Sequence, residues 1–476
     1  MKHFGPAPQD RAQNRDWAWQ CLHCRAPLAG CATGFRCSGC KRDYPVVAGI
    51  PLLVNAPAAY LASGCASLRR ALKVAERRCD RADATLPEIA RARHREVAEA
   101  EIARLKLFLG LLGPSCAEAD TPAQAAAGRQ AQGWPLDALV PYLMRDWTGT
   151  AELAATAEQI GAVLSNAMPD ARERSVVFAA CGAGGLLARL GAGFGRALGF
   201  DLTLPVLAAA RRLLDGESLD LPLSRRIAGA GRMTLSGGDK PPHPGGFGLV
   251  AMDACETALA DASVDCVVTS FMLDLMPDPL RLAYEINRVL AGGGVWINYG
   301  PSGPLAARWR FDLEEVAAFL HDAGFGVIEQ RACRATYLDL SRDLPAWSFR
   351  SHICYLTAAR KIGPPPARAP APVPPLPADS GLVPEHFPQA ELIAVQGLGA
   401  TDESRISFRT EPAPGRGESV AVGSAEARAL MLVDGERTLA EIARLLGGEF
   451  PADVAGEAAA ALTRYAARGL LRWRVP

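Results

Sequence analysis

Short apolar runs alternate with amphipathic stretches through the middle of the chain. The runs at 176–180 and 264–269 have the length of buried strands, and another follows the triple glycine at 292–294. Between such runs, apolar residues recur at the spacing of one helix face. This alternation over residues 135–361 predicts an α/β domain, with a mostly parallel sheet covered by helices on both faces.

The flanking regions have other patterns. Before the α/β domain, apolar residues in an Ala-, Arg- and Glu-rich stretch recur at helical spacing, and after it comes a run rich in Pro and Ala. We therefore expect a cysteine-rich ribbon at 1–58, a helical segment at 59–134, the α/β domain at 135–361, a semi-rigid linker at 362–384 and a small domain at 385–476.

The C-terminal segment has the pattern of a winged-helix-like domain. Short strands are expected at 405–410 and 418–423, followed by helices separated by the turn at Asp434 and Gly435. Thr438 and the glutamate three residues later form a capping-box pattern that begins a helix.

Composition limits the classes of partner and compartment. Lys plus Arg and Asp plus Glu both total 51, so no overall charge favours a nucleic-acid partner. The chain shows neither a signal-peptide pattern nor an uncharged apolar run long enough to span a membrane, so a cytoplasmic protein is expected. Its 13 cysteines are then expected to be reduced thiols plus a metal site.

Two cysteine pairs near the N-terminus have the spacing of a zinc ribbon. Cys21 and Cys24 form one C-x2-C pair, Cys37 and Cys40 form the other, and twelve residues separate the pairs. Two such knuckles place four thiolates around a tetrahedral ion, and a closed site of this kind is structural. The alternative is four ordinary buried cysteines. His23 and Cys31 are interpreted as bystanders, because four thiolates complete the coordination.

The ribbon has a recognisable ending. The segment "YPVVAGIPLLV" at 44–54 resembles the ending of the small zinc-ribbon proteins that serve as activator subunits of tRNA and protein methyltransferases. The resemblance covers about 35 residues.

A glycine-rich turn follows the first strand of the α/β domain. Gly182, Ala183 and Gly184 lie between that strand and a helix, an arrangement that lets a nucleotide approach the backbone. Asp201 ends the next strand about 17 residues later, where an acid binds ribose hydroxyls, and Asp253 ends the third. The alternative is a tight turn that binds no nucleotide.

This order resembles the class I S-adenosylmethionine (SAM) methyltransferases, whose domain is Rossmann-like. The resemblance implies that Asp253 contacts the adenine amine beside the amide of Ala254, and that Ser270, at the end of the fourth strand, also binds SAM. The sequence departs from the pattern at Ala180, where an acid is usual, and at Leu186, where a third glycine is usual.

Three separated pieces resemble the carnosine N-methyltransferase family. They are "LMRDWTG" at 143–149, "TSFMLDLMPDPLRLAYEINRVLAGGGVWINYGP" at 269–301 and "RATYLDLSRDLPAWSFRSHICYLTAARK" at 334–361. The resemblance implies that Arg145 reaches the SAM carboxylate and that Asp274 lies beside a substrate imidazole. The alternative role for Asp274 is a helix N-cap.

The acceptor side departs from that family. Leu305 stands near the position of the family's histidine, and His352 stands near a substrate-contacting tyrosine, although a shift in alignment would place Tyr355 there instead. Tyr299, at the end of the Trp-Ile-Asn-Tyr strand, is expected at the ligand edge of the sheet. Tyr299 and His352 are therefore candidate catalytic residues beside Asp274, with a capped turn and a plain strand end as the alternatives.

The C-terminal domain, with "DGERTLAEIARLL" at 434–446 and "RGLL" near the end, resembles PqqD-like domains. These hold leader peptides by strand addition. The alternative is a generic winged helix that dimerises or contacts DNA.

The leading hypothesis is a SAM-dependent N-methyltransferase with structural zinc, acting on an imidazole or related nitrogen of a histidine-containing small molecule or peptide. A leader peptide at the C-terminal domain is a possible partner, and neither a membrane nor a nucleic acid is expected. The alternatives are a peptide-binding scaffold with a vestigial methyltransferase fold and an RNA methyltransferase.

Overall fold

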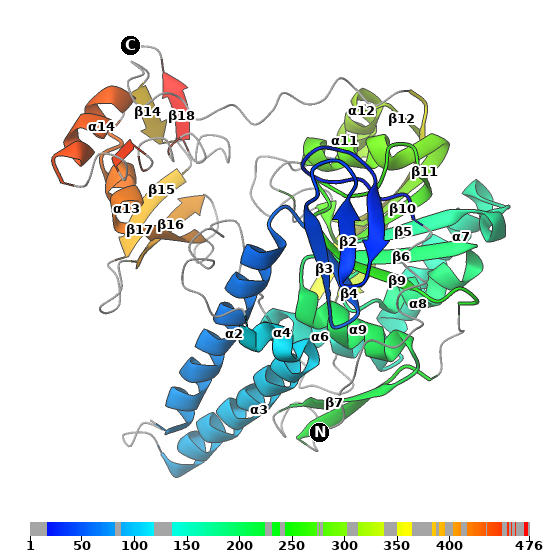
Figure 1. Ribbon diagram of the computed structural model, residues 1–476, viewed down its shortest axis with the longest axis horizontal. Coiled ribbons are helices and arrows are strands. Elements are labelled where there is room, and N and C mark those ends of the chain that lie inside the picture. Colours follow the sequence, from blue (N-terminus) through cyan, green and yellow to red (C-terminus); the bar gives the residue numbers. More distant parts are fainter. Residues whose placement is uncertain are drawn as a thin grey trace. The chain divides into compact units, whose positions relative to one another are not determined.

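The structure is a computed structural model, shown in Figure 1. It describes residues 17–80, 87–118, 136–223, 231–238, 243–273, 276, 279–301, 313–337, 350–363, 383–386, 390–395, 403–410, 417–434, 436–449, 455–456, 458, 462 and 471–474. Contacts divide the chain into two units. The first is Met1–Ser302 with Phe311–Pro366, and the second is Gly303–Arg310 with Ala367–Pro476.

An eleven-stranded sheet runs through the first unit, in the order β1-β2-β3-β4-β9-β6-β5-β10-β11-β13-β12. Its strands are β1 (Leu28–Cys31), β2 (Gly34–Cys37), β3 (Asp43–Val47), β4 (Ile50–Leu53), β5 (Ser175–Ala179), β6 (Arg196–Asp201), β9 (Gly248–Met252), β10 (Val264–Ser270), β11 (Leu290–Gly300), β12 (Phe325–Tyr337) and β13 (Arg350–Lys361). The six strands from β4 to β11 run parallel, and the outer strands pair antiparallel. The prediction of a mostly parallel central sheet in an α/β fold is confirmed.

Helices cover both faces of this sheet (Figure 1). The described helices of this unit are α2 (Pro57–Asp80), α3 (Glu88–Leu112), α4 (Pro114–Glu118), α6 (Leu136–Trp147), α7 (Ala151–Ala167), α8 (Gly185–Leu190), α9 (Leu204–Leu214), α11 (Pro279–Val289) and α12 (Leu313–Asp322), with 3-10 turns η1 (Ala171–Glu173) and η2 (Gly191–Gly193). Val176 and Phe178 of β5 point into a core with α6 to α9, while Val177 and Ala179 point into a second core with α11 and α12. Every β5 residue is buried, which explains why this strand appears in the sequence as one short apolar run.

The cysteine-rich ribbon is part of the same sheet. Its last strand, β4, pairs in parallel with β9, with Leu52 opposite Ala251 and Leu53 opposite Met252. The ribbon strands β1 to β4 thus extend the sheet beyond β9, whose end carries the predicted adenine-binding acid (Figure 1).

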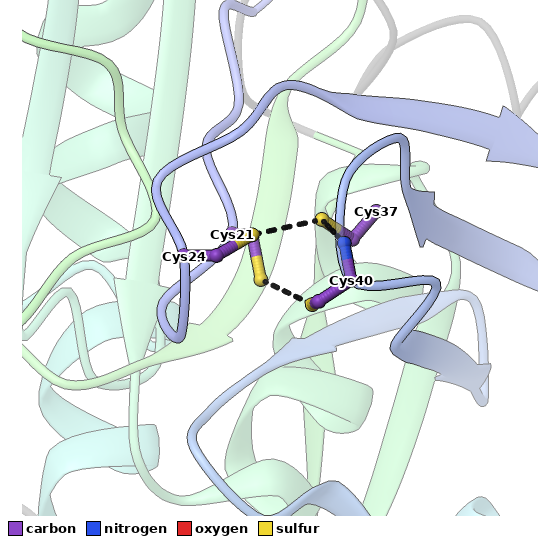
Figure 2. A group of neighbouring side chains, drawn as sticks. All are labelled: Cys21, Cys24, Cys37 and Cys40. Atoms are coloured by element: carbon purple, nitrogen blue, oxygen red, sulfur yellow. Dashed lines mark hydrogen bonds between the residues drawn. The ribbon is translucent and has the colours of Figure 1, made fainter.

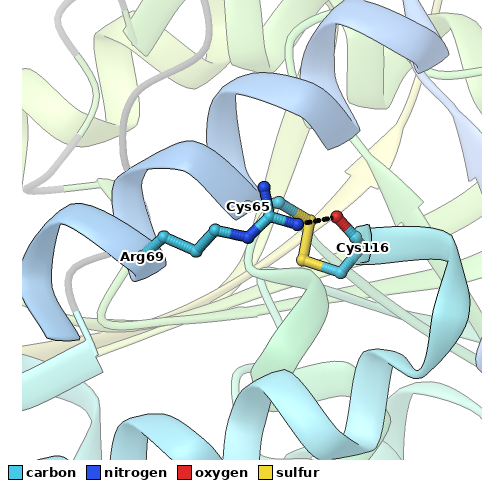
Figure 3. Close-up of a disulfide and its surroundings, with 3 residues drawn as sticks. All are labelled: Cys65, Arg69 and Cys116. Carbon is cyan, nitrogen blue, oxygen red and sulfur yellow. Dashed lines mark hydrogen bonds between the residues drawn. A yellow bond between two sulfur atoms is a disulfide. The ribbon is translucent and has the colours of Figure 1, made fainter. Parts of the chain in front are cut away.

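The predicted helical segment contains a long hairpin. Helices α2 and α3 lie side by side, and this part of the prediction is confirmed for the described residues (Figure 1). Cys65 of α2 and Cys116 of α4 form a disulfide, and the Arg69 guanidinium donates to the carbonyl of Cys116 (Figure 3). The expectation of reduced thiols outside the metal site is therefore wrong for this pair, because the fold places the two buried cysteines 5.6 Å apart at Cα.

A separate hairpin, β7 (Ser218–Pro222) with β8 (Arg232–Ser236), follows α9. Among the described residues, no helix combines the length and the apolar character needed to cross a lipid bilayer.

The described part of the second unit contains two small sheets and helices. Strand β14 (Val383–His386) pairs with β18 (Leu471–Arg474), and β15 (Ala390–Val395), β16 (Glu403–Thr410) and β17 (Gly417–Gly423) form a three-stranded antiparallel sheet before α13 (Ser424–Met431) and α14 (Leu439–Gly447). The two predicted strands are confirmed. The PqqD-like and winged-helix identities stay predictions.

The predicted capping box of α14 is confirmed. The Thr438 hydroxyl accepts from the Glu441 backbone N–H at 3.2 Å, and the Glu441 carboxylate accepts from the Thr438 N–H at 2.7 Å. Replacing Thr438 by Ala is expected to lower the free energy of opening of the first turn of α14 by about 1 kcal/mol. Hydrogen exchange of the α14 amides measures this, with Thr438→Ser, which keeps the hydroxyl, as the control. Equal protection in both variants would contradict the prediction.

Candidate functional site

The glycine loop between β5 and α8 has a backbone that only small residues adopt easily. Gly182 and Gly184 have φ of 53° and 83°, and Ala180 is also left-handed, at 51°. A Cβ added to Gly182 would meet nothing within 4 Å, so the loop has open space in front of it. This space at the carboxyl end of a parallel strand is where α/β sheets bind nucleotides.

Asp201 lies beside this loop at the end of β6. Its Oδ2 accepts from the Gly182 N–H at 3.1 Å, and its Oδ1 accepts from the Thr203 N–H at 2.8 Å. The structure thus brings together the glycine loop and the acid that the sequence predicts to bind ribose. Each carboxylate oxygen retains capacity to accept a further hydrogen bond from a ligand hydroxyl.

The remaining predicted cofactor residues lie along the same edge. In the strand order β9-β6-β5-β10, Asp253, Asp201, Gly182 and Ser270 each follow or end a strand, and these four strands are parallel. The Asp253 side chain is exposed but has protein on several sides, and the resulting desolvation raises the pKa of its carboxyl. An exposed carboxylate in a partly enclosed place fits a ligand-lining position. Ala254, the next residue, is buried.

The end of α6 holds the glycine loop from behind. The Asp146 Oδ2 accepts from the Gly185 N–H at 3.0 Å, and the Trp147 Nε1–H donates to the Ala183 carbonyl at 2.8 Å. The sequence analysis singled out Arg145 from this segment and missed its two neighbours. An acid and a tryptophan at the end of an otherwise apolar helix were the available signal.

Arg145 itself is held by acids of the protein. Its Nε donates to the Asp146 Oδ1 at 2.8 Å, its Nη1 lies 3.9 Å from a Glu152 carboxylate oxygen, and its guanidinium lies 5.3 Å from the centre of the Tyr142 ring. A contact of Arg145 with the SAM carboxylate stays a prediction.

The Trp-Ile-Asn piece of β11 forms a network with β10. The Trp296 Nε1–H donates to the Thr269 hydroxyl at 3.0 Å, and that hydroxyl donates to the Asn298 Oδ1 at 2.9 Å. All three residues are buried. The tryptophan and the amide therefore join two strands at their carboxyl ends, a structural use for groups that looked reserved for a ligand.

Tyr299 faces the opposite side of the sheet. It is 1% exposed, and its ring packs edge-on against Phe271 with centroids 5.7 Å apart. Burial, followed by the neighbouring Cys333 and Cys354, raises the pKa of the phenol, and the hydrogen bond with Thr156 offsets this only in part. Its catalytic role stays a prediction, and in this conformation the phenol lies in the core.

The two other catalytic candidates are less well placed. Asp274 lies outside the described residues. For His352 only the backbone is described, opposite Ala335 in β12. Tyr355, the alternative to His352, lies opposite Gly300, beside the carboxyl end of β11.

The four cysteines of the ribbon converge from two loops, as Figure 2 shows. All four sulfurs lie within 4.8 Å of one another, with Cys21 and Cys40 at 3.6 Å and Cys24 and Cys37 at 3.3 Å. Four thiolates at about 2.3 Å from a tetrahedral Zn²⁺ are about 3.8 Å apart, so the cluster fits that ion.

Tyr44 supports this cluster from the core. Its hydroxyl lies 3.3 Å from the Cys21 sulfur and accepts from the Leu22 N–H at 3.2 Å. Burial raises the pKa of the Cys21 thiol, but hydrogen bonds from Tyr44 and from backbone N–H groups outweigh it and bring the pKa to about 6. The thiolate form is the one that binds metal.

The ribbon also holds the segment that follows Asp253. Two side chains of the ribbon donate to residues 256–260: Asn55 Nδ2 donates to Glu256 Oε2 at 2.9 Å, and Arg25 Nη1 donates to the Thr257 carbonyl at 3.4 Å. The backbones are also bonded, by the Gln20 N–H to the Ala258 carbonyl at 2.7 Å and by the Ala260 N–H to the Ala18 carbonyl at 2.8 Å. Between these two bonds, Trp19 and Leu259 form a β-bridge. The ribbon and this segment share one apolar core.

A family model described as a methyltransferase domain matches residues 178–297, about a quarter of the chain. A search among curated proteins gives no match.

Two solved structures illustrate what the fold is similar to. A SAM-dependent methyltransferase from Methanosarcina mazei is 14% identical over 42% of this chain and 97% of its own, with a TM-score of 0.31. The magnesium protoporphyrin IX methyltransferase of Synechocystis PCC 6803, solved with S-adenosylhomocysteine (SAH), is 12% identical over 44% of this chain and 82% of its own, with a TM-score of 0.29.

The matched segment contains β6, β9 and β10, the glycine loop, and both acids that end strands beside it. The chain therefore carries a SAM-dependent methyltransferase domain of the Rossmann-like α/β fold.

Proposed function

We propose that the chain transfers the methyl group of SAM to an imidazole or related nitrogen of a histidine-containing small molecule or peptide. The proposal rests on the three segments that resemble carnosine N-methyltransferases. The observation that supports it is the placement of the longest segment, whose two ends meet at the carboxyl edge of the sheet, where Thr269 of β10 lies opposite Asn298 of β11.

The cofactor residues fit SAM in their chemistry and placement. Open space in front of Gly182 leaves room for the ligand, Asp201 offers acceptors for ribose hydroxyls, and Asp253 offers one for the adenine amine. When bound, SAM supplies a methyl group on a sulfonium that is already activated for transfer. The protein then has to position the acceptor nitrogen in line with it.

Asp274 is the residue to which we assign orientation of the acceptor. A carboxylate that accepts from one ring N–H leaves the other imidazole nitrogen unprotonated and free to attack. The same carboxylate stabilises the imidazolium that develops as the methyl is transferred. On the acceptor side, we keep Tyr299 and His352 as candidates and add Tyr355, whose backbone lies opposite Gly300.

Two further assignments belong to this proposal. The four-cysteine cluster holds a structural Zn²⁺, for which the sulfur separations are suitable. The second unit binds a peptide, as its resemblance to PqqD-like domains implies, and the acceptor histidine would lie in such a peptide or in a free dipeptide.

Replacing Asp274 by Asn is expected to lower methyl transfer by about 10²- to 10⁴-fold, the range typical of a positioned acid or base. The assay follows labelled methyl from SAM to carnosine, histidine and short histidyl peptides, with SAH affinity measured in parallel. Asp278→Asn, four residues further along the chain, is the matched control and is expected to keep both activity and affinity.

An Asp274→Asn variant as active as the Asp278→Asn variant would contradict the role of Asp274. If the unaltered protein binds SAH but methylates none of these acceptors, the imidazole proposal is wrong.

A further inference from the structure

The segment before the methyltransferase domain match touches the cofactor loop at two buried points. Asp146 is 1% exposed and accepts from the N–H of Gly185, the first residue of α8. Trp147 is 4% exposed and donates its indole N–H to the carbonyl of Ala183, within the loop. The loop thus donates one hydrogen bond to α6 and accepts one from it.

The approach of Asp146 to the loop is close enough to require a glycine. A Cβ on Gly185 would lie 2.6 Å from both Cβ and Cγ of Asp146. Gly185 is therefore required by its close contact with α6, whereas Gly184 is required by the left-handed backbone of the turn. This explains why a glycine opens the helix although its φ is ordinary.

Two carboxylates hold the loop from opposite ends. Asp201 accepts from Gly182 and Asp146 accepts from Gly185. Burial is the largest cause of the raised pKa of Cys181, the loop residue before Gly182, and the charges of Asp201 and Asp146 raise it further. The loop includes left-handed residues, whose conformation costs free energy unless neighbouring groups fix it. Fixed before the cofactor arrives, the loop needs no ordering when SAM binds.

A buried carboxylate needs a partner of its own, and Arg145 supplies it. The guanidinium is 14% exposed and donates to the Asp146 oxygen that does not face the loop. The second acid, Glu152 of α7, lies on the other side of the guanidinium at 3.9 Å. Arg145 is thereby positioned to orient Asp146.

We infer that Asp146 and Trp147 are positioning residues that hold the glycine loop in its cofactor-binding conformation, and that Arg145 acts on SAM affinity through Asp146. The inference needs only the use of SAM, and it does not depend on which acceptor is methylated.

The first test compares Asp146→Asn and Trp147→Phe with the unaltered protein. Both are expected to raise the dissociation constant for SAH by about tenfold, the worth of a buried hydrogen bond of this kind. In cofactor-free protein, amides 182–188 are expected to exchange faster with solvent. Asp265→Asn is the matched control, because Asp265 accepts from the Ser175 N–H at the opposite end of β5 and pairs with Arg174.

The control is expected to lower the melting temperature while leaving SAH affinity and loop exchange unchanged. If Asp146→Asn does not fold, Trp147→Phe decides, because it removes the indole N–H while keeping an aromatic ring at this position. Variants of α6 that lower the melting temperature but keep normal SAH affinity and loop exchange would overturn the inference.

A second test separates the two roles open to Arg145. Methylthioadenosine lacks the amino-acid part of SAH and so lacks its carboxylate. If Arg145 acts through the loop, Arg145→Gln weakens binding of both compounds by a similar factor, and its effect does not add to that of Asp146→Asn. If Arg145→Gln weakens binding of SAH but not of methylthioadenosine, and its effect adds to that of Asp146→Asn, Arg145 contacts the carboxylate directly. That result would overturn this part of the inference.

Discussion

Removal of the Zn²⁺ proposed for the four-cysteine cluster is expected to unfold the ribbon and weaken SAH binding by at least about a hundredfold. Structural zinc contributes on the order of 10 kcal/mol or more of apparent free energy to folding of small cysteine sites. The ribbon strands are only four or five residues long, too short to hold their fold without the ion. Loss of the ion therefore releases β4 from β9 and frees residues 256–260.

The consequence for the cofactor follows from where β9 ends. Asp253 comes directly after β9, and the residues just beyond it are bonded to the ribbon. Once the ribbon unfolds, β9 becomes an edge strand that pairs only with β6, and Asp253 loses its fixed position. The adenine side of the site is then lost, while Asp201 on the neighbouring strand β6 and the glycine loop after β5, one strand further, are expected to persist.

The measurement begins with elemental analysis, which is expected to find one zinc per chain in reduced protein. SAH affinity is then compared before chelation, after it, and after zinc is restored. Cys37→Ser is expected to act like chelation. Cys31→Ser is the control, because Cys31 lies in the same ribbon outside the cluster. Full SAH affinity in metal-free protein, or in Cys37→Ser, would contradict the prediction.

The parallel sheet could be predicted because its strands are buried on both faces. Each then appears as a short apolar run, as 176–180 does, and the helices between them have one apolar face. The acids Asp201 and Asp253 were predictable for a related reason. A polar residue directly after such a run has to lie at the carboxyl edge of the sheet.

Contacts between distant segments left no such local signal. Nothing in the spacing of the ribbon residues indicates that β4 pairs with β9, about 200 residues later. The disulfide between Cys65 and Cys116 joins two helices whose separation along the chain gives no hint of their proximity.

The polar groups of β11 illustrate a second limit. A tryptophan and an amide at a strand end have the same appearance in sequence whether they face a ligand or a neighbouring strand. The Thr269 hydroxyl, on the neighbouring strand, satisfies both the Trp296 N–H and the Asn298 oxygen. Only the register of β10 against β11, which pairs Thr269 with Asn298, distinguishes the two cases.

Replacing Asp201 by Ala is expected to weaken SAH binding by roughly a hundredfold or more. Its carboxylate accepts from Gly182 and Thr203, and the proposed ribose contacts would use the capacity that remains. Each hydrogen bond to a charged group is worth about 1.5–3 kcal/mol, so loss of two ribose bonds and of the loop contact exceeds a hundredfold. The cost in stability is expected to be small, because Gly182 and Thr203 are both half-exposed and their freed N–H groups can bond to water.

Isothermal titration with SAH measures this effect, and thermal unfolding of the cofactor-free variant measures its cost in stability. Asp220→Ala provides the control, because Asp220 is exposed on the β7–β8 hairpin and pairs with Arg232. The SAH affinity of Asp201→Asn is expected to lie between those of Asp201→Ala and Asp220→Ala, since an amide keeps one acceptor oxygen but loses the charge. If Asp201→Ala binds SAH as tightly as the control, the ribose cannot lie at this strand end. The cofactor would then have to bind elsewhere along the carboxyl edge, and the roles assigned to the glycine loop and to α6 would fail with it.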